Sequence, residues 1–149
     1  SHLKSQFRLV LVGARGWDDA EILRLSRITD GVEWKDYVSD EEYQSLLSTA
    51  TVFAYPSLYE GFGMQILDAL QRGIPILTSN RGSLKEVTGD AAMVVDPESV
   101  QSITTGLSAL LESESLRSEY ALKGPIQAEI FTWKRTVDLF LEAIESTVY

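Results

Sequence analysis

Short apolar runs alternate with amphipathic segments along most of this chain. Each run is bounded by Gly, Pro, Asp or Ser, which is typical of buried parallel strands. We expect strands at 7–13, 32–38, 51–55, 74–78 and 92–95. Strands that alternate with helices predict an α/β fold, a three-layer Rossmann-like doubly wound parallel sheet with right-handed crossovers.

Apolar residues recur with helical spacing between these runs. The predicted helix starts are Asp18 or Asp19 as a cap, Ser39 with Glu42 as a capping box, Ser83, and Asp96 followed by Pro97 at the first helical position. The helix after 97 carries Val100, Ile103, Leu107 and Leu110 on one face, and the helical pattern continues to Gly124-Pro125. A C-terminal amphipathic helix carries Trp133, Val137, Phe140, Leu141, Ile144 and Val148.

The stretch 55–68 joins the end of a strand to a helix through a glycine loop. Pro56 ends the strand because proline has no N–H for the ladder, and Gly61 and Gly63 form the loop. Such a loop points free backbone N–H groups at an anion, usually a phosphate. In a doubly wound sheet it lies at the carboxyl ends of the strands, where ligands bind.

Two carboxylates flank the start of the helix that follows this loop. Glu60 lies just before it, and Asp68 lies roughly 7–8 Å along its axis. With a diphosphate at the helix start, Asp68 would reach a ribose diol and Glu60 the hydroxyls of a second sugar. Alternatively, Glu60 only compensates the helix dipole and Asp68 is a solvated acid. Spacing alone does not separate these interpretations, because one glycine turn before a helix is a weak motif.

Composition narrows the classes of function. The 149 residues suffice for one domain with a single core, and the net charge of -9 argues against a nucleic-acid partner. The chain has no cysteine, and its only histidine, His2, lies where a tag remnant is the simplest interpretation. Thiolate chemistry and a histidine-based catalytic or metal site are therefore not expected. No apolar run approaches the roughly 18 residues that span a bilayer.

The run Tyr55-Pro-Ser-Leu-Tyr-Glu-Gly-Phe-Gly, followed from Asp68 by Asp-Ala-Leu-Gln-Arg-Gly-Ile-Pro-Ile-Leu-Thr-Ser, resembles the retaining glycosyltransferases of family 4, also called group 1. Their pattern is a Pro-Ser-x-x-Glu-Gly-Phe-Gly run whose Glu is separated by seven residues from a second acid. Other matching segments follow in the same order, at 9–13, 15–17, 38–43, 82–87, 89–92, 95–97 and 131–133. The resemblance covers most of the chain.

The resemblance implies the C-terminal, donor-binding half of a two-domain GT-B enzyme. Such enzymes move a sugar from a nucleoside-diphosphate-sugar to a glycan or lipid-linked acceptor with retention of configuration. Glu60 would be the catalytic residue of this half and would hold hydroxyl groups of the donor sugar. The main-chain amides at 61–64 would bind the diphosphate, and Asp68 would bind the ribose. The loop at 37–38 would border the nucleotide base. The implied donor-binding residues are Glu60, Gly61, Phe62, Gly63, Met64, Asp68, Tyr37 and Val38. The nucleotide sugar is a substrate, and neither a cofactor nor a metal ion is implied.

Three positions depart from the family pattern. Asp68 replaces the usual Glu and is one methylene shorter, Gln65 stands where Pro is common, and Asp36 stands where Gly is common. The family's domain also begins with a strand and helix that carry an Arg and a Lys for the diphosphate. Arg15 and Arg81 lie at strand ends, and we interpret both as solvated loop charges.

The chain therefore starts one strand later than the family's domain. We interpret 7–149 as a truncated donor-binding domain that alone does not catalyse transfer, and 1–6 as a tag or a disordered start. Without the central strand, we expect the strands at 7–13 and 51–55 to close up on each other, or two copies to pair through the exposed sheet edge.

These interpretations leave two alternative functions and predict the partners of the chain. The alternative functions are a non-catalytic nucleotide-binding module and half of a sugar-nucleotide epimerase. The expected partners are a nucleotide-sugar donor and the N-terminal domain of the same enzyme, without nucleic acid. We expect a cytoplasmic enzyme whose membrane association, in the full-length protein, comes from the other half, because this acidic half has no basic patch for anionic lipids.

Overall fold

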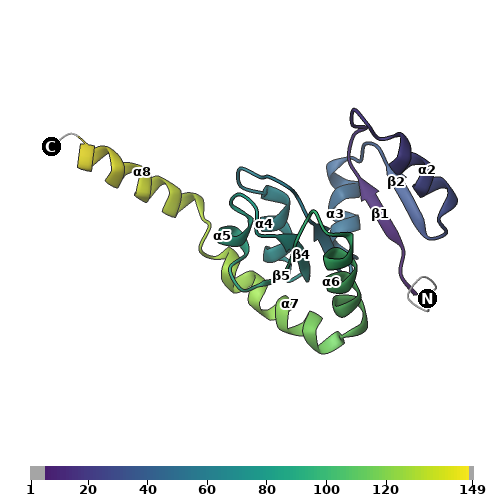
Figure 1. Ribbon diagram of the computed structural model, residues 1–149. Coiled ribbons are helices and arrows are strands. Elements are labelled where there is room, and N and C mark those ends of the chain that lie inside the picture. Colours follow the sequence, from purple (N-terminus) through teal and green to yellow (C-terminus); the bar gives the residue numbers. More distant parts are fainter. Residues whose placement is uncertain (1–5, 148–149) are drawn as a thin grey trace. The chain divides into compact units, whose positions relative to one another are not determined.

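Figure 1 shows the computed structural model, which describes residues 6–147. The chain divides into two compact units, Ser1–Leu46 and Leu47–Tyr149, called here the first and second unit. Of the predicted start at 1–6, only Gln6 falls within the described residues, and Val148 lies outside them.

The first unit is a βαβ arrangement followed by the start of a third helix. Its elements are β1 (Leu9–Val12), α2 (Ala20–Ile28), β2 (Val32–Lys35) and α3 (Asp40–Ser48), which crosses the boundary between the units. β1 and β2 pair in parallel with Leu9 opposite Val32, as the alternating pattern predicts. The strand predicted at 32–38 ends at Lys35, so Tyr37 and Val38 lie in the loop before α3.

Helix starts in the first unit fall where the sequence predicts them, but the carboxylates that we expected at the caps have other partners. Asp19 is the N-cap residue of α2, yet its carboxylate makes no capping bond and instead accepts Nε and Nη2 of Arg15 at 2.8 and 3.0 Å. Ser39 Oγ accepts the N–H of Glu42 at 3.2 Å, while the Glu42 carboxylate pairs with Lys35 at 2.8 Å. Charge-assisted partners thus compete successfully with neutral backbone donors for these carboxylates.

The second unit holds a three-stranded parallel sheet in the order β3-β4-β5. Its elements are β3 (Phe53–Tyr55), α4 (Met64–Gln71), β4 (Ile76–Ser79), α5 (Leu84–Thr88), β5 (Ala92–Val95), α6 (Val100–Glu112), α7 (Glu114–Ala128) and α8 (Trp133–Thr147). Every residue of the central strand β4 is buried, as its continuous apolar run predicts. Tyr55 of β3 lies opposite Thr78 of β4, which sets the register at the carboxyl ends of the strands.

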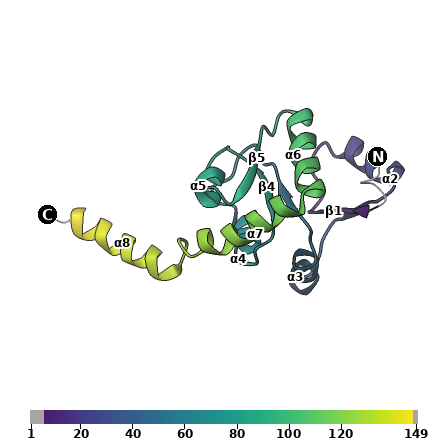
Figure 2. The ribbon, with the colours of Figure 1, turned by 90° about the horizontal axis from the view of Figure 1, so that it is seen from below.

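The core of the second unit lies between the sheet and its helices. Leu77 of β4, Val95 of β5 and Leu110 of α6 form a buried cluster, and α6 packs against β5 (Figures 1 and 2). The predicted apolar face of α6 is confirmed, except that Val100 at its first position is exposed. α7 contacts both α4 and α6. At Gly124 the approach to α4 is close, because an added Cβ would lie 2.9 Å from the main-chain oxygen of Leu70.

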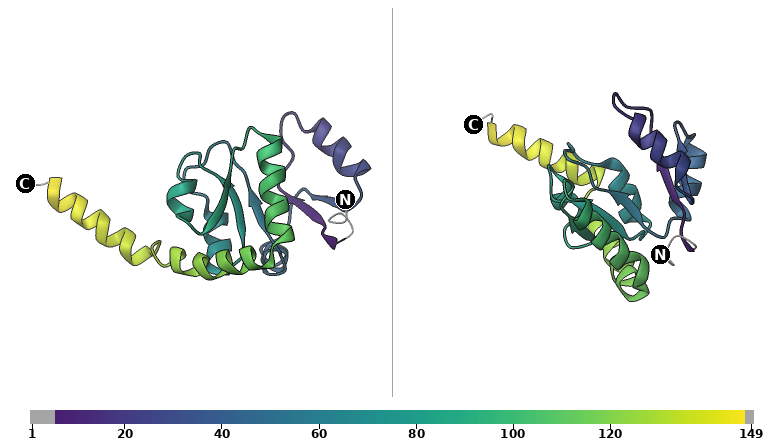
Figure 3. Two further views of the ribbon diagram at one scale, coloured as in Figure 1. Left: turned by 60° about the horizontal axis from the view of Figure 1, so that its bottom comes forward. Right: turned by 45° about the vertical axis from the view of Figure 1, so that its right-hand side comes forward.

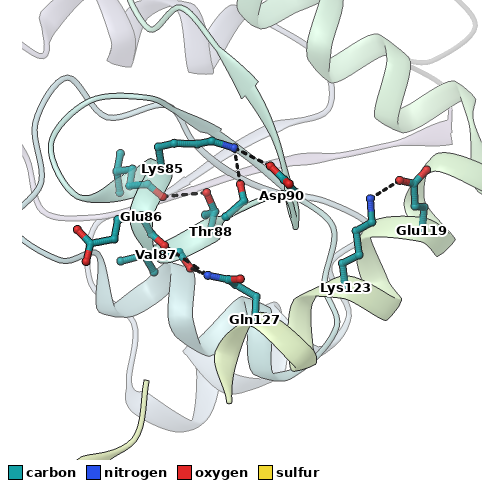
Figure 4. A network of polar contacts seen from close by, with 10 residues as sticks. Lys85, Glu86, Val87, Thr88, Asp90, Glu119, Lys123 and Gln127 are labelled. Carbon is teal, nitrogen blue, oxygen red and sulfur yellow. Dashed lines mark hydrogen bonds and ion pairs between the residues drawn. The ribbon is translucent and has the colours of Figure 1, made fainter. Parts of the chain in front are cut away.

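Side chains hold the short helix α5 against α7 (Figure 4). Nε2 of Gln127 in α7 donates to the main-chain oxygens of Glu86 and Val87 at 3.3 and 3.1 Å, which satisfies carbonyls at the end of α5. Lys85 Nζ lies 3.0 Å from the carboxylate of Asp90 and, mainly through this hydrogen bond, lowers the pKa of Asp90. The contacts of Gln127 join residues about forty positions apart, so no local pattern in the sequence predicts them.

Two predicted helix limits in the second unit are wrong. α6 does not start at Asp96-Pro97 but at Val100, because Ser99 caps it by accepting the N–H of Ser102 at 3.1 Å. The pattern that we expected to stop at Gly124-Pro125 continues through Pro125 to Ala128. Packing of α7 on α4 therefore outweighs the helical bond that proline removes.

The described strands pair within their own units. β1 pairs with β2 in the first unit, and β3 pairs with β4 in the second, while closure of the strands at 7–13 and 51–55 on each other stays a prediction. Each observed pair joins strands that one crossover helix connects, α2 for β1 and β2 and α4 for β3 and β4. Pairing of two copies through a sheet edge stays a prediction.

The amphipathic C-terminal helix is confirmed as α8, but none of its residues is buried. Its apolar side chains are exposed, and α8 continues beyond α7 without packing on the sheet of its own unit (Figure 3). No helix in residues 6–147 combines the length and the apolar composition that a membrane span requires.

Candidate functional site

The loop between β3 and α4 carries most of the predicted site. Gly63 is the N-cap of α4 in the left-handed conformation, with φ 84° and ψ 59°, which favours glycine. Its main-chain oxygen accepts the N–H of Ile66 at 2.9 Å, so the helix starts directly after the loop. No side chain caps this helix start. The amides of its first turn therefore face the loop in the manner that anion sites use.

Glu60 lies in this loop, and its side chain is half-buried. Two hydroxyl groups donate to the same carboxylate oxygen, Oε1: Tyr55 Oη at 2.7 Å and Ser57 Oγ at 3.1 Å. Both donors are in or next to the end of β3. The carboxylate is thus held by the strand end that precedes it, an arrangement that sequence spacing did not predict.

The loop after β4 holds the main chain of Glu60. The amide N–H and the hydroxyl of Ser83 each donate to the Glu60 carbonyl oxygen at 3.4 Å. We expected the Ser83 side chain to cap α5, and this is wrong, because Ser83 occupies the N-cap position without a capping bond. Gly82, with φ 56°, lies directly against the Glu60 main chain, where any Cβ would overlap the carbonyl oxygen.

Two buried hydroxyl groups at the end of β4 hold the main chain of the loop between β3 and α4. Thr78 Oγ1 donates to the Tyr55 carbonyl oxygen at 2.9 Å, and Ser79 Oγ donates to the Ser57 carbonyl oxygen at 2.5 Å. Thr78 and Ser79 are fully buried. Buried hydroxyls need partners, so two hydroxyl residues at the end of an apolar strand were a signal in the sequence that we did not use.

Asp68 is half-buried in α4, on the helix that begins at the glycine loop. Glu60, the main chain of 61–64 and Asp68 therefore belong to the same unit, and their joint role stays a prediction. The rings of Phe62 and Phe131 pack in a T-shaped arrangement with centroids 5.5 Å apart, so the Phe62 side chain contributes to packing. Tyr37 and Val38 belong to the first unit, where the Tyr37 side chain is exposed. Their contact with the base of the nucleotide stays a prediction.

Arg15 and Arg81, which we interpret as solvated loop charges, each form an ion pair at the surface. Arg15 pairs with Asp19 at 2.8 Å, and Arg81 pairs with Glu98 at 2.8 Å. Arg81 also lines a shallow pocket of about 360 Å³ at the carboxyl ends of β4 and β5, together with Asn80, Val94, Val95 and Asp96. Within residues 6–147, no three His, Cys, Asp or Glu side chains are grouped to hold a metal ion.

The ion pair of Arg15 and Asp19 predicts a pH-dependent contribution to the stability of the first unit. The hydrogen bonds from Arg15 lower the pKa of the Asp19 carboxyl. Because the folded pKa lies below the unfolded one, the stabilisation is present above the unfolded pKa and is lost as the pH falls through the folded pKa. In a carbon-13 NMR titration we expect the pKa of the Asp19 carboxyl to lie below its ordinary value.

Arg15→Gln should raise the Asp19 midpoint toward the ordinary value. Arg24→Gln is the matched control, because Arg24 pairs with Glu21 at 2.6 Å in the same unit and has no hydrogen bond to Asp19. An unchanged Asp19 midpoint in Arg15→Gln, or an equal shift in both variants, would contradict this prediction.

Solved structures show which fold this chain has. HepE from Anabaena, in complex with UDP, has a TM-score of 0.79 at 18% identity, over 95% of this chain and 41% of that one. The C-terminal domain of the group 1 glycosyltransferase LpcC from Francisella tularensis has a TM-score of 0.70 at 20% identity, over 83% of this chain and 68% of that one. The predicted fold is confirmed: it is the Rossmann-like C-terminal half of a GT-B fold.

The sequence profile described as "Glycosyl transferases group 1" matches residues 1–125, and the chain belongs to that family. It is 38% identical over 134 residues to the O-antigen chain mannosyltransferase B of Escherichia coli, which covers 88% of this chain and 35% of that protein. It is 37% identical over 125 residues to the MMP alpha-(1->4)-mannosyltransferase of Mycolicibacterium hassiacum, over 78% of this chain and 30% of that protein. The chain thus spans about a third of the length of these relatives.

Proposed function

We propose that this chain is the donor-binding half of a retaining glycosyltransferase of family 4, which moves a sugar from a nucleoside-diphosphate-sugar to a glycan or lipid-linked acceptor. One observation carries the proposal: a positioned carboxylate, Glu60, lies directly before an uncapped helix start that follows a glycine loop. A carboxylate suits sugar hydroxyls, and a helix start suits a phosphate.

Each part of the loop has a role in the proposed mechanism. The amides of 61–64 bind the diphosphate, and the partial positive charge of the helix start stabilises the negative charge that grows there as the bond between sugar and phosphate breaks. Glu60 accepts hydrogen bonds from hydroxyls of the donor sugar and orients its reacting carbon. Asp68 accepts from the ribose, and the loop at 37–38 borders the base. The nucleotide sugar is the substrate, and the proposal includes no cofactor.

The names of the relatives suggest the sugar. Two relatives more than 35% identical to this chain are named mannosyltransferases. We therefore propose a mannosyl donor. The acceptor is bound by an N-terminal domain of the same enzyme, so the 149-residue chain alone does not catalyse transfer. The full enzyme is cytoplasmic, and any membrane association comes from that other domain.

A nucleotide titration followed by amide NMR tests this function. UDP, GDP and ADP are added in turn to the nitrogen-15-labelled chain. We expect saturable shifts at Gly61, Gly63 and Met64 with at least one nucleotide, because their amides would contact the diphosphate. The amide of Gly106, inside α6, is the internal control and should not move. If no nucleotide shifts the loop amides, the proposed donor site is wrong.

A further inference from the structure

The carboxylate of Glu60 is held at one oxygen. Tyr55 and Ser57 both donate to Oε1, and Oε2 takes part in neither bond. An ionised carboxylate only accepts, so the hydroxyls are the donors; the one proton of Ser57 is shared between Oε1 and the main-chain oxygen of Tyr59, which lies 3.2 Å from Ser57 Oγ. Tyr55, with Ser57 as a second donor, restricts the position of Oε1 and with it the side-chain rotamer of Glu60. Oε2 is thereby set in one direction before any ligand arrives.

Both donors are themselves fixed by the sheet. The Tyr55 ring stacks on Phe53, with centroids 5.8 Å apart and planes at 16°. The main-chain oxygens of Tyr55 and Ser57 accept the buried hydroxyls of Thr78 and Ser79, as described above. A continuous series of polar contacts therefore runs from the buried strand β4 to Oε1 of Glu60. Such support is what holds a binding group in its productive geometry.

We propose that Tyr55 and Ser57 are positioning residues, which hold Oε1 so that Oε2 is presented to hydroxyl groups of the donor sugar. This inference rests on the proposed function. It adds a specific consequence: the two hydroxyls contribute to recognition of the sugar and not of the nucleotide diphosphate. Because the Glu60 carboxylate is ordered when the protein folds, its conformational entropy is lost before the sugar arrives. The sugar therefore binds more strongly than it would to a mobile carboxylate.

The test compares two ligands that differ only in the sugar. Affinities of the 149-residue chain for GDP-mannose and GDP are measured by NMR titration, with UDP-glucose and UDP as a second pair. For Tyr55→Phe and for Ser57→Ala we expect an affinity for the nucleotide sugar about three- to tenfold weaker, with the nucleotide diphosphate unchanged. Ser57→Thr keeps a hydroxyl and should retain most of the sugar affinity.

The control variant is Tyr59→Phe, which removes a hydroxyl from an exposed ring in the same loop. It should leave both affinities unchanged. A chemical denaturation curve for each variant checks folding, and Ser57→Ala carries the test if Tyr55→Phe does not fold. Tyr55→Phe keeps the ring that stacks on Phe53, so packing is preserved.

The outcomes separate the two proposals. If the wild-type chain binds neither nucleotide diphosphates nor nucleotide sugars, the proposed function fails and this inference fails with it. If the wild-type chain binds them but the variants leave the ratio of the two affinities unchanged, only the positioning role is overturned. Equal losses for both ligands would show a general structural role for the hydroxyls and would also overturn it.

Discussion

Gly82→Ala is expected to destabilise the second unit by about 2–4 kcal/mol and to displace the main chain of Glu60. Gly82 has φ 56°, in the left-handed region that L side chains rarely adopt. Its missing Cβ also makes room for Glu60, because the carbonyl oxygen of Glu60 occupies the position where a Cβ would project. The added Cβ and the Glu60 carbonyl oxygen are both attached directly to main-chain atoms, so no side-chain rotation can relieve the overlap.

The measurement is chemical denaturation followed through amide signals of Leu77 and Val95, which report on the second unit alone. The matched control is Gly61→Ala in the neighbouring loop, where an added Cβ would meet no atom within 4 Å and φ is not positive. Gly61→Ala should change the free energy of unfolding by less than about 0.5 kcal/mol. Equal effects of the two substitutions, or an unmoved Glu60 amide in Gly82→Ala, would contradict the prediction.

Local signals were enough to predict the outline of the site. The apolar run at 51–55, the stop at Pro56 and the glycines at 61 and 63 each act through near neighbours in the chain. They correctly place a loop and a helix start after β3. Fold class followed from the alternation of runs and helices in the same way, since each crossover helix brings its own two strands together.

The contacts that hold Glu60 could not be predicted in this way. Ser83 and Gly82 reach Glu60 from more than twenty positions along the chain, and the contact depends on the register that sets Tyr55 opposite Thr78. Competing partners explain the wrong caps. Asp19 and Ser83 lie where caps are expected, but the nearby Arg15 binds the side chain of Asp19, and the distant Glu60 carbonyl binds that of Ser83.

The unpredicted course of α7 has a similar cause. A proline inside a helix usually ends or kinks it, and a glycine before it strengthens that expectation. Here Gly124 lets α7 approach the main chain of Leu70, and the packing gained on α4 keeps the helix intact through Pro125. A local rule therefore fails where tertiary contact supplies more free energy than the lost hydrogen bond.

Leu110→Ala is expected to lower the stability of the second unit by about 2–5 kcal/mol. Leu110 is fully buried against Leu77 and Val95, and the close-packed cluster leaves little room to collapse around the missing atoms. Because Leu77 precedes Thr78 and Ser79 in β4, the loss should reach the hydroxyls that fix the loop of Glu60. Hydrogen exchange at Tyr55 and Ser57 should therefore accelerate along with the loss in unfolding free energy.

Leu139→Ala in α8 is the matched control for Leu110→Ala, because it removes the same atoms from a helix where the side chain is 53% exposed. It should cost less than about 0.5 kcal/mol, since little apolar surface leaves contact with protein. A loss as large as that of Leu110→Ala would mean that α8 packs on the chain in solution. A small loss in both variants would mean that the cluster around Leu77 does not form the core, and the support for Glu60 from β4 would then fail as well.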